Sequence, residues 1–260
     1  MRRFSMIGMF ATAAMLVFFA ARAAQGQPPR AGASLLEEIR RIEFTSISYD
    51  EEATPYYGYT KGSIPILISA PHGAKHFRAS DGTWKAEDAY TASLAIVLGR
   101  LTGAHVLYVK NQTREDPNND TGTAYKEFLK GVVQANHIRF ILDLHGSAGQ
   151  KPKVDVGIME ASPSQCSCPT FRDTLEGAFF DLEPKVFNQR FAARGAGTVT
   201  CFARNYLGIE AAQVEISRNY RIVMSKSTGF KADPKNVLDM VERLRKAILA
   251  INQKMSRPPL

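Results

Sequence analysis

The sequence predicts an α/β fold, namely a three-layer α/β/α sandwich built around a mixed, largely parallel sheet. Two runs of mostly apolar residues, 64–70 (IPILISA) and 139–147 (RFILDLHGS), are typical of strands that are buried on both faces. Segments with the spacing of amphipathic helices alternate with such strands, as in α/β proteins. The chain has 260 residues, 45% of them hydrophobic, which is enough for one large core. Residues 28–260 are therefore predicted to form a single domain.

The pattern predicts the individual elements in order. Helices are expected at 34–42, 85–101, 123–136, 171–181 and 234–255. Acidic residues near the start of the segment 85–101 suit the dipole at the beginning of a helix. Strands are expected at 44–49, 64–70, 104–110, 139–147, 154–159, 197–203 and 211–217.

Residues 1–27 have the composition of a secretory signal peptide. A positively charged start precedes the apolar stretch 6–21, and small residues then lead to a proline-rich exit, with cleavage expected after Ala23 or Gly26. An uncleaved membrane anchor is the alternative, but the apolar run is short for a spanning helix. The segment therefore predicts Sec export to the periplasm or exterior, with no stable membrane insertion after cleavage.

The charge balance of the mature chain argues against nucleic-acid binding. The signal peptide carries three arginines and no acid, so its removal lowers the formal charge from +8 to +5. The remaining basic residues are scattered, and no nucleic-acid-binding motif is present. We expect a small-molecule or peptide-like substrate, and the basic surface favours an anionic one.

Three cysteines, Cys166, Cys168 and Cys201, fall in the exported part, where disulfides are permitted. The first two are too close in sequence for an easy mutual bridge, so Cys201 is expected to bond to one of them. The lack of a CxxC pair argues against a structural zinc site.

Polar residues gather at the carboxyl ends of the predicted strands, which is where ligands bind in open α/β sheets. His72 follows the strand 64–70, Asp143 and His145 lie near the end of 139–147, and Glu215 lies in 211–217. The strand 104–110 leads toward Arg114. Histidines and carboxylates that converge in this way are typical of a catalytic zinc site, which keeps a coordination position open for water.

Each of these residues also has a structural interpretation. A single histidine after an apolar strand is often structural, and Asp143 can orient a ligand rather than bind metal. Glu215 is harder to explain structurally, because a carboxylate inside a buried strand is costly unless it is paired or bound to metal. His76 has no strand before it and is expected to lie outside the site. A serine-hydrolase interpretation fails because the sequence has no GxSxG elbow.

Five motifs occur in the order and approximate spacing found in the N-formylglutamate amidohydrolase family, which the chain resembles over residues 64–224. They are SAPHGAKHF (69–77), AEDAYTASL (86–94), DPNND (116–120), ILDLHGS (141–147) and AQVEISRNYR (212–221). The resemblance implies the phosphorylase/hydrolase-like fold and the metal-dependent amide hydrolysis of zinc-carboxypeptidase-like enzymes.

The resemblance also implies the roles of individual residues. One Zn²⁺ ion would be held by His72, by either Glu87 or Asp88, and by His145. The family pattern favours Asp88, whereas carboxypeptidase-like sites commonly use Glu, so the choice stays open; Mn or Co can occupy similar ligands. Glu215 resembles the general base that activates water and then protonates the leaving amine.

One departure from the family concerns substrate binding. In the family an Asn-Arg pair holds the substrate carboxylate, but here Asn118 is followed by Asn119. Arg114, Arg204 or Arg218 is expected to supply the missing bidentate contact. Otherwise the substrate differs from N-formylglutamate, and export favours another acylated amino acid or a peptide.

The sequence therefore predicts a zinc-dependent hydrolase of an amide bond in a carboxylate-bearing substrate. One alternative is an exported carboxypeptidase, or a peptidase acting on peptidoglycan or poly-γ-glutamate. Another is a non-catalytic exported protein that binds a metal or ligand with the same fold. An unaltered metal content after Glu215→Gln, with no activity to lose, would identify the non-catalytic alternative.

Overall fold

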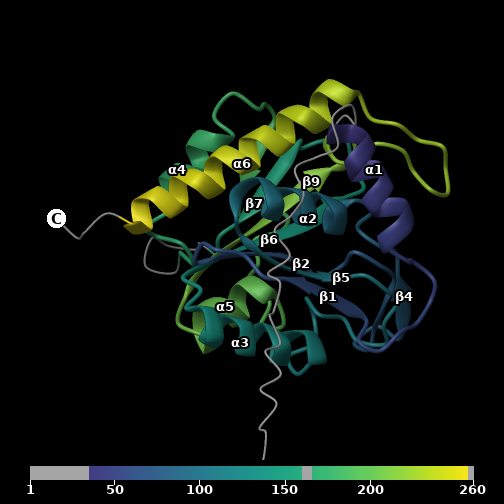
Figure 1. The fold of residues 1–260 in the computed structure, drawn as a ribbon, viewed down its shortest axis with the longest axis horizontal. Coiled ribbons are helices and arrows are strands. Elements are labelled where there is room, and N and C mark those ends of the chain that lie inside the picture. The colour runs from purple at the N-terminus through teal and green to yellow at the C-terminus, as the bar shows by residue number, and fades with distance from the viewer. Residues whose placement is uncertain (1–34, 160–165, 257–260) are drawn as a thin grey trace, which may run out of the picture. The chain divides into compact units, whose positions relative to one another are not determined.

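The computed structural model describes residues 35–159 and 166–256, which belong to one compact unit. The predicted signal peptide lies outside these ranges. Within them, seven strands form the main sheet (Figure 1). From one edge to the other these strands are β1 (Tyr57–Thr60), β5 (His105–Val109), β2 (Ile66–Ala70), β6 (Phe140–Ser147), β9 (Glu210–Ser217), β7 (Val154–Gly157) and β8 (Lys185–Phe187).

The sheet is mixed and largely parallel, as predicted. The four strands β5, β2, β6 and β9 run parallel to one another. At one edge β1 is antiparallel to β5, and on the other side β7 is antiparallel to β9 and parallel to β8. A separate two-stranded hairpin consists of β3 (His76–Arg78) and β4 (Thr83–Lys85).

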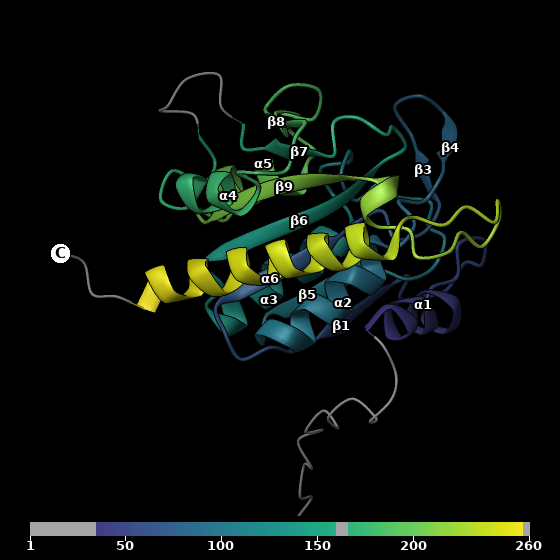
Figure 2. The same ribbon diagram turned by 90° about the horizontal axis from the view of Figure 1, so that it is seen from above.

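Helices cover both faces of the sheet, which confirms the α/β sandwich (Figures 1 and 2). One face carries α1 (Leu35–Ser46), α2 (Thr91–Thr102), α4 (Arg172–Ala178) and α6 (Pro234–Ser256). The opposite face carries α3 (Ala124–Asn136) and α5 (Val199–Tyr206). Among the described helices, none combines the length and apolar character that crossing a bilayer requires.

The apolar run of β2 shows why the central strands lack a polar alternation. Ile66 and Ile68 join the core beneath α2 and α6, whereas Leu67 joins the core beneath α3. All three residues are fully buried. Because successive side chains point to opposite faces, a strand covered on both sides is apolar at nearly every position.

The chain reverses its direction of travel across the sheet between β2 and β6. Helix α2 leads from β2 outward to β5, and α3 then leads back to β6 on the other side of β2. Such a switch point leaves a crevice beyond the carboxyl ends of the two strands, where α/β proteins bind ligands. His72 and His145 lie at this place.

Three predicted elements differ from the structure. Residues 44–46 end helix α1 instead of starting a strand, and α2 begins only at Thr91. The predicted strand 197–203 is wrong, because α5 occupies Val199–Tyr206. Its β-branched residues suggested a strand, but Thr198 caps a helix by accepting a hydrogen bond from the Cys201 amide. Four short strands, β1, β3, β4 and β8, were not predicted.

The predicted disulfide is also wrong: Cys166, Cys168 and Cys201 are all buried, and none of the three forms a disulfide bond. Cys168 shares a hydrogen bond with Cys166, and both join the core beneath α6. Cys201 lies on α5, which covers the opposite face of the sheet, and its sulfur accepts a hydrogen bond from Asn205. The sheet therefore separates the thiols that were expected to pair.

Candidate metal centre and active-site cavity

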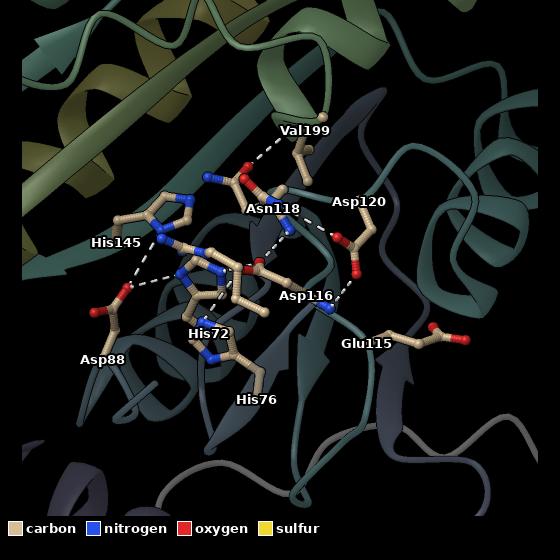
Figure 3. Close-up of polar contacts among 12 residues, drawn as sticks. His72, His76, Asp88, Glu115, Asp116, Asn118, Asp120, His145 and Val199 are labelled. Carbon is tan, nitrogen blue, oxygen red and sulfur yellow. Dashed lines mark hydrogen bonds and ion pairs between the residues drawn. The ribbon is translucent and has the colours of Figure 1, made fainter. Parts of the chain in front are cut away.

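Two histidines and one aspartate meet beyond the ends of β2 and β6. Asp88 Oδ2 lies 3.4 Å from His72 Nδ1 and 3.2 Å from His145 Nδ1 (Figure 3). His72 is 8% exposed and His145 is 2% exposed. The side chains thus converge through their Nδ1 atoms on one carboxylate oxygen.

The main chain explains how Asp88 reaches the two histidines. Its amide donates a hydrogen bond to the His72 carbonyl at 2.7 Å, which joins the two segments directly. Its own carbonyl accepts hydrogen bonds from the amide and the hydroxyl of Thr91. Tyr90 adopts a left-handed conformation with φ of 73°. This turn delays the start of α2 and leaves Asp88 facing the site.

A buried carboxylate holds the outer nitrogen of each histidine. His72 Nε2 donates to Asp116 at 2.8 Å, and His145 Nε2 donates to Asp143 at 2.9 Å. Both aspartates are fully buried. A carboxylate on the outer nitrogen fixes the tautomer and leaves the Nδ1 lone pair available for a metal ion.

The residues present fit a zinc ion. Ligand atoms at about 2.0–2.1 Å around a tetrahedral zinc lie about 3.3–3.5 Å from one another. The two separations from Asp88 Oδ2, 3.2 and 3.4 Å, agree with this spacing. Three protein ligands of the His and Asp types leave the fourth position that a catalytic site needs.

The electrostatics of the cluster follow from its carboxylates. Burial alone would lower the pKa of His72, but its hydrogen bonds to Asp116 and Asp88 raise that pKa above its ordinary value. The pKa of His145 is likewise raised, against burial, by Asp143. Burial opposes ionisation of Asp88, yet its two histidine partners hold its pKa well below the usual range. The carboxylate is therefore ionised, as a metal ligand must be.

The structure distinguishes the two members of the acidic pair. Asp88 contacts both histidines and lines the adjacent cavity, whereas Glu87 is half-buried and does not line it. Burial raises the pKa of Glu87, and the nearby Lys75 partly offsets that rise. Asp88 is therefore the member of the pair whose geometry fits a ligand.

His76 lies beside this cluster, contrary to the expectation from the sequence. Its ring stacks on His72 with 3.9 Å between centroids and 4° between planes. Burial lowers the pKa of His76 to about 3, so this imidazole is neutral. The short strand β3, which the sequence pattern did not reveal, carries it to this place.

His72, His76 and Asp116 are also close enough together to be considered as a second metal site. However, Asp116 already accepts hydrogen bonds from His72 Nε2, from the Asn118 amide at 3.1 Å and from Arg78 Nε at 2.6 Å. A carboxylate that is occupied by a guanidinium suits a supporting role better than metal binding.

Glu215 faces the same site from the neighbouring strand. It is the β9 partner of His145 in the parallel register, and it is 6% exposed. Burial raises its pKa to about 7, although the charge on His145 opposes the rise. One of its oxygens accepts a hydrogen bond from Gln213 at 3.1 Å.

These groups line a cavity of about 600 Å³. The volume suits a ligand of amino-acid or short-peptide size. The residues that line it include His72, Asp88, His145 and Glu215, together with Asn118, Gln213 and the cations Arg78, Lys85, Arg190 and Arg194.

The predicted substrate-binding residues divide into two groups. Asn118 lines the cavity, and its side chain accepts a hydrogen bond from the Val199 amide at 2.7 Å (Figure 3). Arg114 instead pairs with Glu52 on the surface with a 77% exposed side chain. Arg218 lies over the ring of Phe230, 4.8 Å from its centroid. Neither Arg114 nor Arg218 lines the cavity, and neither does Arg204.

Comparisons with known proteins agree on the fold. The chain matches no protein-family model and no curated protein. It resembles the crystal structure of N-formylglutamate amidohydrolase from Ralstonia eutropha JMP134 with a TM-score of 0.52 and 15% identity, covering 76% of this chain and 97% of that one. It also resembles a candidate carboxypeptidase A from Shewanella denitrificans OS-217 with a TM-score of 0.50 and 12% identity, covering 84% and 68% of the two chains. The resemblance inferred from the motifs is thus confirmed at the level of the fold.

Proposed function

We propose that the protein is a zinc-dependent hydrolase that cleaves the amide bond of an N-acyl amino acid or a short peptide-like substrate bearing a carboxylate. The observation that supports this most strongly is the convergence of His72, Asp88 and His145 in one cavity with Glu215. The fold shared with an amidohydrolase supports the same reaction class.

In this proposal His72, Asp88 and His145 hold one zinc ion. When bound, the metal supplies Lewis-acid polarisation of the amide carbonyl and lowers the pKa of a water molecule. Glu215 takes the proton from the attacking water and returns it to the leaving nitrogen. A carboxylate with a pKa of about 7 suits both directions of this transfer near neutral pH.

The surrounding residues orient these groups. Asp116 and Asp143 hold the imidazoles of His72 and His145 with their Nδ1 atoms toward Asp88, where these atoms would be available to the ion. Gln213 holds the carboxylate of Glu215 from the same strand. The site therefore needs little rearrangement before it reacts, which is where much of the catalytic effect of an enzyme originates.

The proposal is tested by comparing the metal content and the amide hydrolysis of two variants with the unmodified protein. His145→Ala removes a proposed ligand, and we expect it to lose zinc and activity together. Glu215→Gln leaves the three ligands in place, and we expect it to keep zinc while losing about 10²–10⁴-fold in kcat. The substrates are a panel of N-acyl amino acids and short peptides.

His137→Asn is a matched control for the loss of a histidine. His137 is exposed, follows α3 and has φ of 51°, a conformation that Asn tolerates. It should keep both zinc and activity. Equal zinc content in the unmodified protein and His145→Ala would overturn the metal site. Zinc binding without hydrolysis across the panel would instead identify a non-catalytic binding protein.

We also propose that the protein is exported, on the basis of residues 1–27. Its substrate is then one that occurs outside the cytoplasm. Sequencing of the N-terminus of the protein recovered from its producing cells tests this, with a start at residue 24 or 27 expected. A protein that retains Met1 or Arg2 would contradict cleavage.

A further inference from the structure

One continuous loop, residues 188–195, contributes a large part of the cavity wall. It leads from β8 toward α5, and all seven residues from Gln189 to Gly195 line the cavity. Most other lining residues come singly or in pairs from separate elements. The loop therefore determines much of what a bound substrate meets.

The loop is held in place by hydrogen bonds to β7 and the residues after it. Asp155 accepts hydrogen bonds from the amides of Arg190 and Phe191, both at 3.1 Å. The Met159 amide donates to the Ala192 carbonyl at 3.0 Å. Asp155 is itself 1% exposed and is the partner of Glu215 in the β7–β9 register. The anchor of the loop and the proposed base therefore belong to adjacent strands.

Gly157 permits the close packing between this loop and β7. A Cβ atom at this position would lie 2.1 Å from the Phe191 carbonyl oxygen, which is closer than two such atoms can approach. Together with the anchoring by Asp155, this contact makes the loop a built wall of the cavity.

The loop carries two of the four cations that line the cavity, Arg190 and Arg194. Of the other two, Arg78 donates to the buried Asp116 at 2.6 Å, and Lys85 pairs with Asp81 at 2.5 Å. Arg190 lies over the ring of Phe191, 5.1 Å from its centroid, and pairs with no carboxylate within the part of the chain that the structure describes. Both loop arginines are exposed. A guanidinium at the mouth of a cavity is well suited to bidentate contact with a carboxylate.

The position at which the family pattern has a substrate-binding arginine supplies no cation in this chain. Asn119 occupies it, and its side-chain amide donates to Ser80 at 3.4 Å and to Asp120 at 3.3 Å. Asn119 does not line the cavity. The Asn119 carbonyl instead packs against Gly197, just beyond the end of the loop. Any strong contact to a substrate anion must therefore come from elsewhere on the wall.

We propose that Arg190 and Arg194 bind a carboxylate of the substrate, so that the loop 188–195 selects anionic substrates. This inference rests on the proposed function for the identity of the ligand, since it assigns a specificity-determining role in the same cavity. Arg190 and Arg194 would thus take the role that the sequence predicted for Arg114 and Arg218.

The test measures binding separately from turnover. In a Glu215→Gln background, in which turnover is expected to be about 10²–10⁴-fold slower, calorimetry compares N-acetylglutamate with its uncharged diamide. The variants are Arg190→Gln, Arg194→Gln and the double substitution. The matched control is Arg41→Gln, because Arg41 is exposed on α1 and does not line the cavity.

We expect the parent protein to prefer the diacid. The double variant should bind the diacid about tenfold to a hundredfold more weakly, because charge-assisted hydrogen bonds are lost. Its affinity for the diamide should stay within about twofold, and Arg41→Gln should match the parent for both ligands. Replacement of both arginines by lysine should restore part of the preference, because the charge returns without the bidentate geometry.

Three results would overturn the inference: no measurable binding of the diacid by the parent, equal affinity for the two ligands, or an equal loss of both in the double variant. The last of these would mean that the arginines only support the loop. A parent that prefers the diacid through these arginines, while the unmodified protein hydrolyses nothing, supports the anion site and contradicts the proposed function.

Discussion

The cavity has two halves that the chain builds in different ways. His145, Asp143 and Glu215 lie on adjacent parallel strands, whose hydrogen-bonded ladder fixes the spacing between them. The opposite wall consists of the loop 188–195 and the hairpin of β3 and β4, neither of which belongs to the main sheet. The loop is attached to the sheet by its hydrogen bonds to Asp155 on β7. Of the proposed reactive groups, His145 and Glu215 therefore lie on the sheet itself, whereas His72 follows the end of β2 and Asp88 lies in the irregular segment before α2. The groups that would meet the rest of a substrate lie on the loop and the hairpin. This division would allow the loops, and with them the substrate specificity, to change while His145 and Glu215 keep their positions on the sheet.

Individual polar contacts, rather than a ladder, hold the loop half together. Asp116 accepts hydrogen bonds from His72, Arg78 and the Asn118 backbone amide, so one carboxylate links the hairpin to the cluster of His72, Asp88 and His145. Lys126, which is fully buried on α3, donates to the carbonyls of Asp120 and Gly197. Each of these contacts supports several segments. A single substitution is therefore expected to disturb more of this half than of the strand half.

The two aspartates behind the histidines test this contrast most directly. Asp143→Asn and Asp116→Asn each weaken the support of one imidazole, and we expect each to lower zinc affinity about tenfold to a hundredfold. Asp143 lies on β6, in the strand half, and accepts a hydrogen bond from His145. Asp116 also holds Arg78 and Asn118, so its variant should additionally weaken substrate binding and raise KM. Competition with a chromophoric chelator measures the affinity, and steady-state kinetics measures KM.

The contrast between the halves fails if the two variants behave alike in both measurements. Unchanged zinc affinity in both variants would show that the carboxylates do not orient the histidines. A rise in KM for Asp143→Asn as large as that for Asp116→Asn would mean that the strand half also shapes the substrate wall. Melting temperatures of the variants provide the control for unfolding, because both carboxylates are fully buried.

The same division explains which residues could be predicted from the sequence. The sequence predicts that His72, His145 and Glu215 meet, because each lies in or directly after an apolar run that is recognisable as a strand. Parallel strands bring their carboxyl ends to one edge of the sheet. The choice between Glu87 and Asp88 stayed open because residues 86–90 form no regular element, and a shift of one residue there reverses which side chain faces the histidines.

Residues on the loop half left no comparable signal. His76 reaches the cavity on a strand of only three residues, and Arg190 does so through hydrogen bonds to Asp155, 35 positions earlier. No local periodicity records such contacts. Arg114 had the appropriate chemistry and followed a predicted strand, yet the chain there turns its side chain toward Glu52. The path of the segment 111–122 determines where the Arg114 side chain lies, and the composition of that segment does not reveal its path.

Arg114→Gln should have the smallest effect of the substitutions considered, although the sequence made it a candidate for substrate binding. The side chain is 77% exposed and lies 3.1 Å from Glu52, and such surface ion pairs contribute about 0–1 kcal/mol. We expect kcat/KM for an anionic substrate to stay within about twofold, whereas Arg190→Gln measured beside it should lower that value. A tenfold or larger rise in KM for Arg114→Gln would show that the segment 111–122 changes its path when a substrate binds. The loop half would then be an induced wall, and the strand half would be the only part of the site that is formed in advance.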